Sequence, residues 1–283
     1  MNPSRLDLAF AECRTYLETH GKSYAYATRS FPQSMRNATY ALYAFFRIPD
    51  ELVDNPTQDP KQTLQNWKTC WQNAYISRDS DHPVLFATAE VFHLYSIPFE
   101  YSEDFLNAML QDTTVDRYAT YADLEKYMHG SAAVVGLMMS YVIGFSNKTA
   151  LAYAAKLGYA MQLTNFLRDI REDLETRNRI YLPQEDLQRF QVTEADLQQQ
   201  RITPSFKQLL RFEIARADSL YEEANRGISF LSRPGRPAVH IASDLYRAIL
   251  RKIEVAHFDI FTHRAHTNFL EKAWISLWAS RKM

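Results

Sequence analysis

Apolar residues recur every three to four positions along most of this chain, and this spacing constrains its fold more than any other feature. In residues 34–54 and 149–176 the apolar positions follow one face of a helix rather than the alternation of a strand. Dipeptides typical of β-hairpins are rare, and the 283 residues include only seven glycines. The spacing therefore predicts an all-α fold.

Prolines divide the chain into its predicted helices, because a proline seldom continues a helix. With 46% hydrophobic residues the chain can fill a sizeable core, and no repeat or change of composition divides it. We therefore expect one domain over residues 1–283. Its helices are predicted at residues 4–20, 34–54, 62–77, 82–96, 102–112, 121–145, 149–176, 184–189, 205–231 and 236–260.

The charge balance gives no reason to expect a nucleic acid partner or attraction to an anionic membrane. The chain has 32 basic and 33 acidic side chains. Its two cysteines, Cys13 and Cys70, fit a reduced compartment better than a disulfide framework. The first residues lack the pattern of a signal peptide, which predicts a cytoplasmic protein. Residues 130–147 are uncharged but are interrupted by serines and glycines, so we expect a buried helix rather than a membrane span.

The segment QLTNFLRDIREDLE, residues 162–175, combines an apolar stripe with two polar flanks when it is placed on a helix of about 100° per residue. On the face opposite the stripe, Arg168 can pair with Glu172, and Arg171 with Glu175, because side chains four residues apart are neighbours on a helix. These four side chains predict an ordinary surface with ion pairs.

The other flank of this segment is a line of carboxylates and amides that contains no base. Two like charges four residues apart disfavour a helix by about 0.2–0.5 kcal/mol, so we expect a cation beside them. Mg²⁺ prefers carboxylate and amide oxygens and usually binds one or two carboxylates together with substrate phosphates. The line consists of Gln162, Asn165, Asp169 and Asp173.

A second polar line, in YALYAFFRIPDELVD at residues 40–54, strengthens this interpretation. Tyr43, Arg47, Asp50 and Asp54 again flank an apolar stripe. One acidic pair alone is weak evidence, because 33 acids among 283 residues produce about four such pairs by chance. If the two helices face each other, their four aspartates form a cage for several cations. The predicted guest is a diphosphate whose departure metals promote.

These segments resemble motifs of the head-to-head prenyl synthases, a family that includes phytoene, squalene and dehydrosqualene synthases. Residues 40–54 are similar to its first aspartate-rich motif, and AMQLTNFLRDIREDLETRNRIYLP, residues 160–183, to its second. HGKSYAYATRSFP at 20–32 resembles a substrate-binding segment, and YMHGSAAVVG at 127–136 resembles the central helix. The ending at 236–265, with RPAVHIASDLYRAILRKI and FDIFTHRA, is most similar to that of bacterial phytoene synthases.

The resemblance implies an all-α isoprenoid-synthase fold with a central cavity and a two-step reaction that depends on two or three Mg²⁺ ions, with Mn²⁺ as an alternative. The metal ligands it implies are Asp50, Asp54, Asn165, Asp169 and Asp173. The diphosphate contacts it implies are His20, Lys22, Ser23, Tyr43, Arg47, Gln162, Arg168 and Tyr246. Tyr127 would line the cavity near the reacting carbons, and Arg179 and Tyr181 would belong to a closing loop. Together with Tyr43 and Arg47, these three are the residues to which we assign catalytic roles.

Some positions depart from what the helical wheel or the family suggests. The wheel turns Arg168 toward the outer face, although its long side chain could reach the site. Pro49 lies within the first motif, where it removes a helical hydrogen bond and is expected to kink the helix and redirect its aspartates. Met128 and Ala133 stand where the family commonly has cysteine and glycine, and we expect Ala133 to narrow the tunnel.

The leading function is the joining of two geranylgeranyl diphosphates to phytoene through a cyclopropylcarbinyl diphosphate, without NADPH. A farnesyl-using squalene, dehydrosqualene or hopanoid-pathway synthase is the alternative within the family. Head-to-tail elongation or terpene cyclisation also uses aspartate-rich helices, but RNRIYLP and NFLRDIRED argue against it. A non-catalytic assembly factor would not need both aspartate pairs. Peripheral contact with a membrane suits such apolar substrates, and the oligomeric state is left open.

Overall fold

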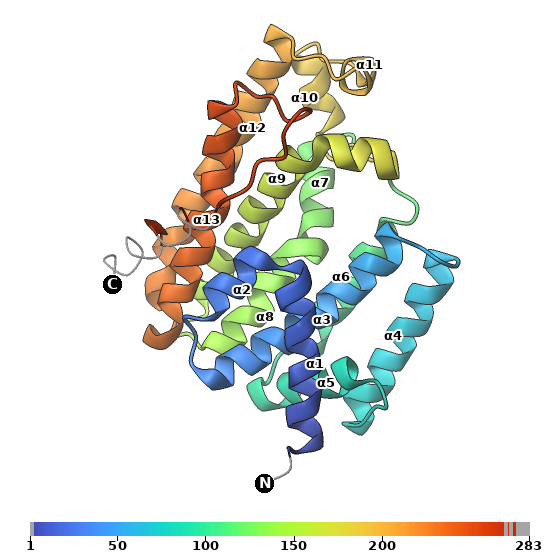
Figure 1. Cartoon of the computed structure of the whole chain (residues 1–283), viewed down its shortest axis with the longest axis vertical. Helices are drawn as coiled ribbons and strands as arrows, with labels where there is room; N and C mark the ends of the chain where they lie inside the picture. Colours follow the sequence, from blue (N-terminus) through green and yellow to red (C-terminus); the bar gives the residue numbers. More distant parts are fainter. Residues whose placement is uncertain (1–2, 269–270, 272–273, 276–283) are drawn as a thin grey trace.

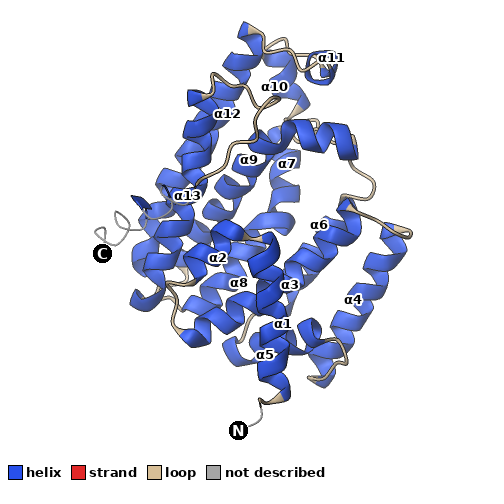
Figure 2. Ribbon diagram, viewed as in Figure 1, coloured by secondary structure: helices blue, strands red, loops and turns tan. Residues whose placement is uncertain are grey.

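The computed structural model describes residues 3–268, 271, 274 and 275, and within them the chain is built of helices without a strand (Figure 2). Two isolated β-bridges, Arg117 with Ile180 and Phe145 with Leu231, fasten loops to one another. The all-α prediction is confirmed.

Each of the predicted helices corresponds to a helix of the structure. The helices are α1 (Arg5–His20), α2 (Lys22–Thr28), α3 (Gln33–Asp54), α4 (Pro60–Ser77), α5 (Pro83–Tyr95), α6 (Phe99–Gln111), α7 (Tyr121–Met128), α8 (Val134–Ile143), α9 (Thr149–Arg177), α10 (Gln184–Arg189), α11 (Glu194–Gln198), α12 (Pro204–Arg226) and α13 (Arg236–Val255). A π-helical turn (His129–Ala133) joins α7 to α8, and 3₁₀ turns (Gly227–Phe230, Arg233–Gly235) join α12 to α13.

The predictions were wrong at several boundaries. The short helices α2 and α11 were missed, and the predicted helix at 121–145 is divided by the π-helical turn. Helix α13 ends before residue 260 because His257 and Phe258 take positive φ angles of 55° and 66°, which a right-handed helix does not allow. For α11 the sequence did carry a signal, since Thr193 and Asp196 form a capping box.

Helix α9 passes through the middle of the molecule, with the other helices around it (Figure 1). It packs against α12, α8 and α13 and against the π-helical turn, while α3 packs against α1, α4 and α5. In Figure 1, α4 lies at the edge of the molecule opposite to α12 and α13. A large apolar cluster, which includes Phe45, Trp71 and Tyr221, fills the space between these helices.

Two glycines allow α9 and its neighbours to approach at backbone distance. A Cβ at Gly158 would lie 2.6 Å from the carbonyl oxygen of Ala132, and a Cβ at Gly136 would lie 2.6 Å from that of Ala154. A larger side chain at either position would clash with the backbone of the neighbouring helix. The prediction that Ala133 narrows the tunnel is wrong, because Ala133 is fully buried and does not line the cavity described below, whereas Ala132 does.

None of the helices in the described part of the chain is both long and apolar enough to cross a membrane. The uncharged segment at 130–147 instead forms the π-helical turn and α8, whose side chains face the interior. Cys13 is buried, Cys70 is exposed, and neither forms a disulfide.

Candidate active site

A cavity of about 1180 Å³ lies between α2, α3, α7, α8, α9 and α13. Its polar lining comes largely from the C-terminal parts of α3 and α9 and from the junction of α1 and α2, and its apolar lining comes largely from α8 and the N-terminal part of α9. All sixteen residues with predicted site roles line this cavity, although they come from distant parts of the sequence. They are His20, Lys22, Ser23, Tyr43, Arg47, Asp50, Asp54, Tyr127, Gln162, Asn165, Arg168, Asp169, Asp173, Arg179, Tyr181 and Tyr246.

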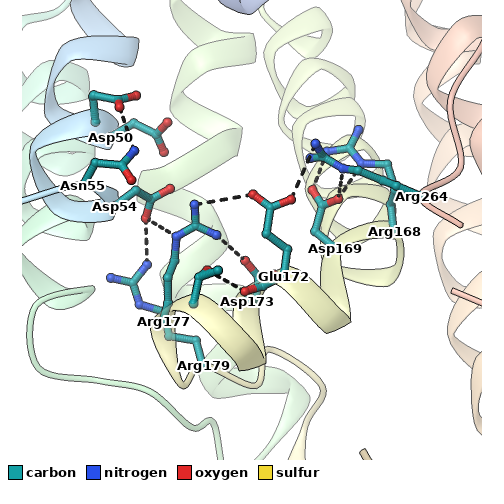
Figure 3. A network of polar contacts seen from close by, with 12 residues as sticks. Asp50, Asp54, Asn55, Arg168, Asp169, Glu172, Asp173, Arg177, Arg179 and Arg264 are labelled. Atoms are coloured by element: carbon teal, nitrogen blue, oxygen red, sulfur yellow. Dashed lines mark hydrogen bonds and ion pairs between the residues drawn. The ribbon is translucent and has the colours of Figure 1, made fainter. Parts of the chain in front are cut away.

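Arg177 connects an aspartate of α3 to one of α9, and Arg179 binds the same aspartate of α3 (Figure 3). The Arg177 guanidinium lies 2.9 Å from Asp54 Oδ1 through Nε, and 3.2 Å from Asp173 Oδ1 through Nη1. Arg179 Nη1 also donates to Asp54 Oδ1 at 3.1 Å. Burial, followed by the neighbouring Asp169 charge, raises the pKa of Asp173 to about 8. The arginines of the site therefore do not fully neutralise its buried carboxylates.

The carboxylate of Asp169 is held by two further arginines (Figure 3). Arg168 Nε donates to Asp169 Oδ1 at 2.8 Å, and Arg264 Nε donates to the same oxygen at 2.7 Å. Burial raises the pKa of this carboxyl, but the hydrogen bonds from Arg168 and Arg264 outweigh burial and keep it below its usual value. The predicted polar line of α9 thus contains no base itself, but two basic side chains from outside the line bind its Asp169.

The structure corrects the predicted outer face of residues 162–175. Arg171 and Glu175 do form an exposed pair, with Nε 3.0 Å from Oε2. Arg168 instead lines the cavity with only 18% of its side chain exposed, and its guanidinium pairs with Asp169. Glu172 also lines the cavity, and it lies near Arg264 rather than Arg168.

Pro49 does not end the first aspartate-bearing helix. Helix α3 continues through this buried proline to Asp54, and Asp50 and Asp54 both line the cavity. Arg47 Nη1 donates to Asp50 Oδ2 at 2.5 Å. Burial, followed by the charge of Asp54, raises the pKa of Asp50 to about 6. The predicted change in the direction of these aspartates stays a prediction, and both reach the cavity from a continuous helix.

The cage of four aspartates stays a prediction, and arginines lie among these carboxylates in this arrangement. Across residues 3–268, 271, 274 and 275, no three acidic, histidine or cysteine side chains converge where one metal ion could bind. Arg177 of α9 pairs with Asp54 of α3, and Arg264 pairs with Asp169. One buried acceptor stays unused, because the amide oxygen Asn165 Oδ1 has no hydrogen-bond partner.

A buried acid that the sequence did not single out, Asp112, lines the cavity at the end of α6. Tyr127 Oη donates to Asp112 Oδ2 at 2.5 Å, and Tyr181 Oη donates to Oδ1 at 3.4 Å. Arg179 Nη2 donates to the backbone carbonyl of Asp112 at 2.9 Å. The ring of Tyr181 stacks on Phe166 of α9 with 4.0 Å between centroids. The predicted catalytic residues Tyr127, Tyr181 and Arg179 thus all meet at Asp112.

Sequence reasoning missed Asp112, Arg177 and Arg264. For Arg177 a signal existed, since it follows Asp173 by four residues on the same helix. Asp112 is a lone acid after the end of α6 and belongs to no periodic pattern. Arg264 lies after the last helix turn of α13, in a segment without helical spacing, so only the fold brings it to Asp169.

Comparison with known proteins decides the family. A family model described as squalene/phytoene synthase matches residues 17–271. The chain belongs to the squalene/phytoene synthase family. It is 35% identical to the 15-cis-phytoene synthase of Synechocystis sp. over 94% of this chain and 85% of that protein. It is also 35% identical to the phytoene synthase of Thermus thermophilus, over 91% and 87% of the two chains.

Solved structures of the squalene/phytoene synthase family share the fold. The crystal structure of a dehydrosqualene synthase in complex with ligand superposes with a TM-score of 0.92 at 27% identity, covering 98% of this chain and 97% of that one. The squalene synthase HpnC from Alicyclobacillus acidocaldarius superposes with a TM-score of 0.83 at 24% identity, covering 91% and 97%. The family and the isoprenoid-synthase fold are confirmed, and this squalene/phytoene synthase family member is a prenyltransferase.

Proposed function

We propose that this prenyltransferase joins two geranylgeranyl diphosphates head to head to form phytoene, in a reaction that needs Mg²⁺ and passes through a cyclopropylcarbinyl diphosphate. The observation that carries the proposal is the 35% identity to phytoene synthases over more than nine-tenths of the chain. The cavity supports it, because polar groups for diphosphates gather at one end and apolar lining for prenyl chains extends from them.

The donor set around the two aspartate pairs fits a divalent cation. The unpartnered buried oxygen of Asn165 and the raised pKa values of Asp50 and Asp173 mark carboxylate and amide groups that gain from a nearby cation. The residues that would hold Mg²⁺ are Asp50, Asp54, Asn165, Asp169 and Asp173. When bound, such ions neutralise the diphosphate charge and favour its departure.

The arginines of the site have a second role under this proposal. Arg47, Arg177 and Arg264 compensate carboxylates in the substrate-free protein. Guanidinium groups also match the geometry of phosphate oxygens, so the same side chains can turn from carboxylates to diphosphates. Under the proposal, Arg47, Arg177 and Arg264 therefore contact the diphosphates as well as the carboxylates.

The walls of the cavity protect the prenyl cations that form when diphosphate leaves. Phe166, Tyr127 and Tyr181 present aromatic rings there, with Tyr127 and Tyr181 stacked at 5.7 Å between centroids. Aromatic faces stabilise cations by their negative quadrupole. The apolar lining of α8 and α9 excludes water that would otherwise capture the carbocation.

Product analysis tests the proposed reaction. The protein is incubated with Mg²⁺ and geranylgeranyl or farnesyl diphosphate, with and without NADPH, and the hydrocarbons are identified by mass spectrometry. We expect a C40 hydrocarbon from geranylgeranyl diphosphate without NADPH. A C30 product alone, or none, would contradict the proposal.

A farnesyl-using synthase is the second candidate. It is favoured by one observation, the TM-score of 0.92 to a dehydrosqualene synthase. A C30 hydrocarbon from farnesyl diphosphate, with no C40 product, would select this candidate. Its appearance with or without NADPH would then separate a squalene from a dehydrosqualene product.

A further inference from the structure

Asp112 is a carboxylic acid that lines the cavity but belongs to neither of the two aspartate motifs. Its side chain is buried, lines the cavity and belongs to neither α3 nor α9. Both carboxylate oxygens are contacted by phenols, Oδ2 by Tyr127 and Oδ1 by Tyr181. No arginine side chain donates to this carboxylate in the described structure, because Arg179 binds its backbone carbonyl instead.

The charges that face Asp112 leave its carboxylate poised to accept a proton. Burial raises its pKa to about 7, while Arg179 and the Tyr127 hydrogen bond lower it and the charges of Asp54 and Asp50 on α3 raise it. Tyr118, from the loop before α7, and Tyr181 complete the titratable neighbours. A carboxyl that titrates near neutral pH is suited to general acid–base catalysis.

The proposed reaction requires proton acceptors. Each prenyl unit loses its diphosphate as an anion and one proton from carbon, so joining two units without a reductant releases two diphosphates and two protons. A base must therefore reach these carbons in a part of the cavity from which water is excluded, and it is either a departing diphosphate or a side chain. Tyr127 is the predicted neighbour of those carbons, and its hydroxyl is bonded to Asp112 at 2.5 Å.

We propose that Asp112 is the proton-accepting partner of Tyr127 in this reaction. The inference rests on the proposed function. When the last double bond forms, the electron pair of the C–H bond becomes the π bond and its proton passes to the hydroxyl oxygen of Tyr127. The hydroxyl proton of Tyr127 moves at the same time to Oδ2 of Asp112. Tyr127 ends as a neutral phenol and Asp112 as a carboxylic acid, which loses its proton to solvent after product release.

Because Asp112 acts through Tyr127, it is a positioning residue as well as a proton acceptor. A purely structural role would consist of holding Tyr127 and the loop of Arg179 in place, and an asparagine could fill it. Asparagine keeps the size of aspartate and still accepts the Tyr127 hydrogen bond, but it cannot take up a proton. Asp112→Asn therefore separates the two roles.

The experiment compares steady-state kinetics, pH profiles and products of wild type, Asp112→Asn and Asp112→Glu with geranylgeranyl diphosphate and Mg²⁺. For Asp112→Asn we expect kcat to fall about 100-fold with KM within about threefold, and loss of the acidic limb that the wild-type kcat shows. Slow proton loss also lets water capture the cation, so prenyl alcohols should appear. Asp112→Glu should restore part of the rate and the acidic limb.

A matched control loses a buried hydrogen bond away from the cavity. Trp71 Nε1 donates to Ser102 Oγ at 2.8 Å, and neither residue lines the cavity. Ser102→Ala should lower the melting temperature but leave kcat, the pH profile and the products unchanged.

An infrared titration of the substrate-free protein tests the pair without turnover and does not depend on a folded Asp112→Asn variant. Asp50, Asp173 and Glu213 also have raised pKa values, of about 6, 8 and 8, so the response to Tyr127→Phe identifies Asp112. We expect the carboxyl that titrates near pH 7 to move to a higher pKa in Tyr127→Phe, because the Tyr127 hydrogen bond lowers that pKa in the wild type. The absence of such a carboxyl overturns the inference. So does an Asp112→Asn variant with the wild-type kcat and pH profile, provided that the wild type makes a C40 hydrocarbon. Failure of the wild type to make that hydrocarbon overturns the proposed function itself.

Discussion

Arg177 of α9 lies 2.9 Å from Asp54 of α3, measured from Nε to Oδ1, and this ion pair bridges the two aspartate-bearing helices. The pair is largely shielded, with 16% of the Arg177 side chain and 17% of the Asp54 side chain exposed. Since the same guanidinium also lies 3.2 Å from Asp173, one cationic group compensates two carboxylates. The two polar lines predicted from the sequence thus do face each other, with arginine between them.

Replacing Arg177 should destabilise the substrate-free protein. Arg177→Gln leaves Asp54 with Arg179 alone and leaves Asp173 without an ion pair, so we expect a loss of about 1–3 kcal/mol in unfolding free energy. Urea unfolding measures this loss. Mg²⁺ with inorganic diphosphate should restore much of it, because cations then compensate the carboxylates.

The control for Arg177→Gln is an exposed ion pair. Arg14 and Glu18 of α1 lie 2.8 Å apart with about half of each side chain exposed, so Arg14→Gln should change stability by about 0.5 kcal/mol or less. If Arg177→Gln is as stable as this control, the arginine does not compensate the aspartates.

Removing one charge from either aspartate pair should stop the reaction but not the folding. Asp54→Asn or Asp169→Asn deletes carboxylate charge without changing side-chain volume, so we expect loss of Mg²⁺-dependent diphosphate release with an unchanged circular dichroism spectrum. A diphosphate-release assay measures the effect. Asp116→Asn, at an exposed carboxylate, is the control that should stay active. Full activity of Asp54→Asn and Asp169→Asn would refute the cation role of the two motifs.

Helical spacing predicted the parts of the fold and the site that depend on local order. Gln162, Asn165, Asp169 and Asp173 share one flank of α9 because residues three and four apart lie on the same side of any helix, and that flank does line the cavity. For the same reason the exposed pair of Arg171 and Glu175 was predictable.

Contacts between distant segments could not be derived from spacing. The wheel fixes where a Cα lies but not where a long side chain ends, which is why Arg168 was placed on the outer face. Asp112 and Arg264 lie outside the periodic helices that gave a signal, and only tertiary packing brings them to Tyr127 and Asp169. Resemblance to the family supplied Tyr127 and Arg179, which spacing alone would have missed.

The depth of the cavity should limit the length of the prenyl chain. Ala154 lines the cavity on α9 and lies fifteen residues before Asp169, or about 22 Å along the helix. Ala154→Phe should fill this apolar end and lower kcat/KM for geranylgeranyl diphosphate by about 10-fold or more, with a smaller effect on farnesyl diphosphate. Competition between the two substrates measures the change.

The control for Ala154→Phe lies on the same helix. Ala152 is exposed and does not line the cavity, so Ala152→Phe should keep the wild-type preference. Equal effects of Ala154→Phe on both substrates would show that the prenyl chains do not reach this end.

A buried acid outside the cavity should make stability fall as pH rises. Glu213 of α12 is 1% exposed, and it shares the guanidinium of Arg216 with Asp186. Burial raises its pKa to about 8, since one guanidinium cannot compensate two buried carboxylates fully. In the unfolded chain the same group titrates near its ordinary value of 4.5.

Between these two pKa values the folded protein keeps a proton on Glu213 that the unfolded chain has released. Stability from this site is therefore fully present below about pH 4.5 and is lost as pH rises through about 8. Glu213→Gln has no proton to lose. Its unfolding free energy relative to that of the wild type should therefore be about 1–3 kcal/mol higher at about pH 9 than at about pH 5. Urea unfolding at these two pH values measures the gain. The control is Glu222→Gln, on the exposed side of α12, whose unfolding free energy should depend on pH as that of the wild type does. If Glu213→Gln showed the wild-type pH dependence too, Glu213 would be ionised in the folded protein.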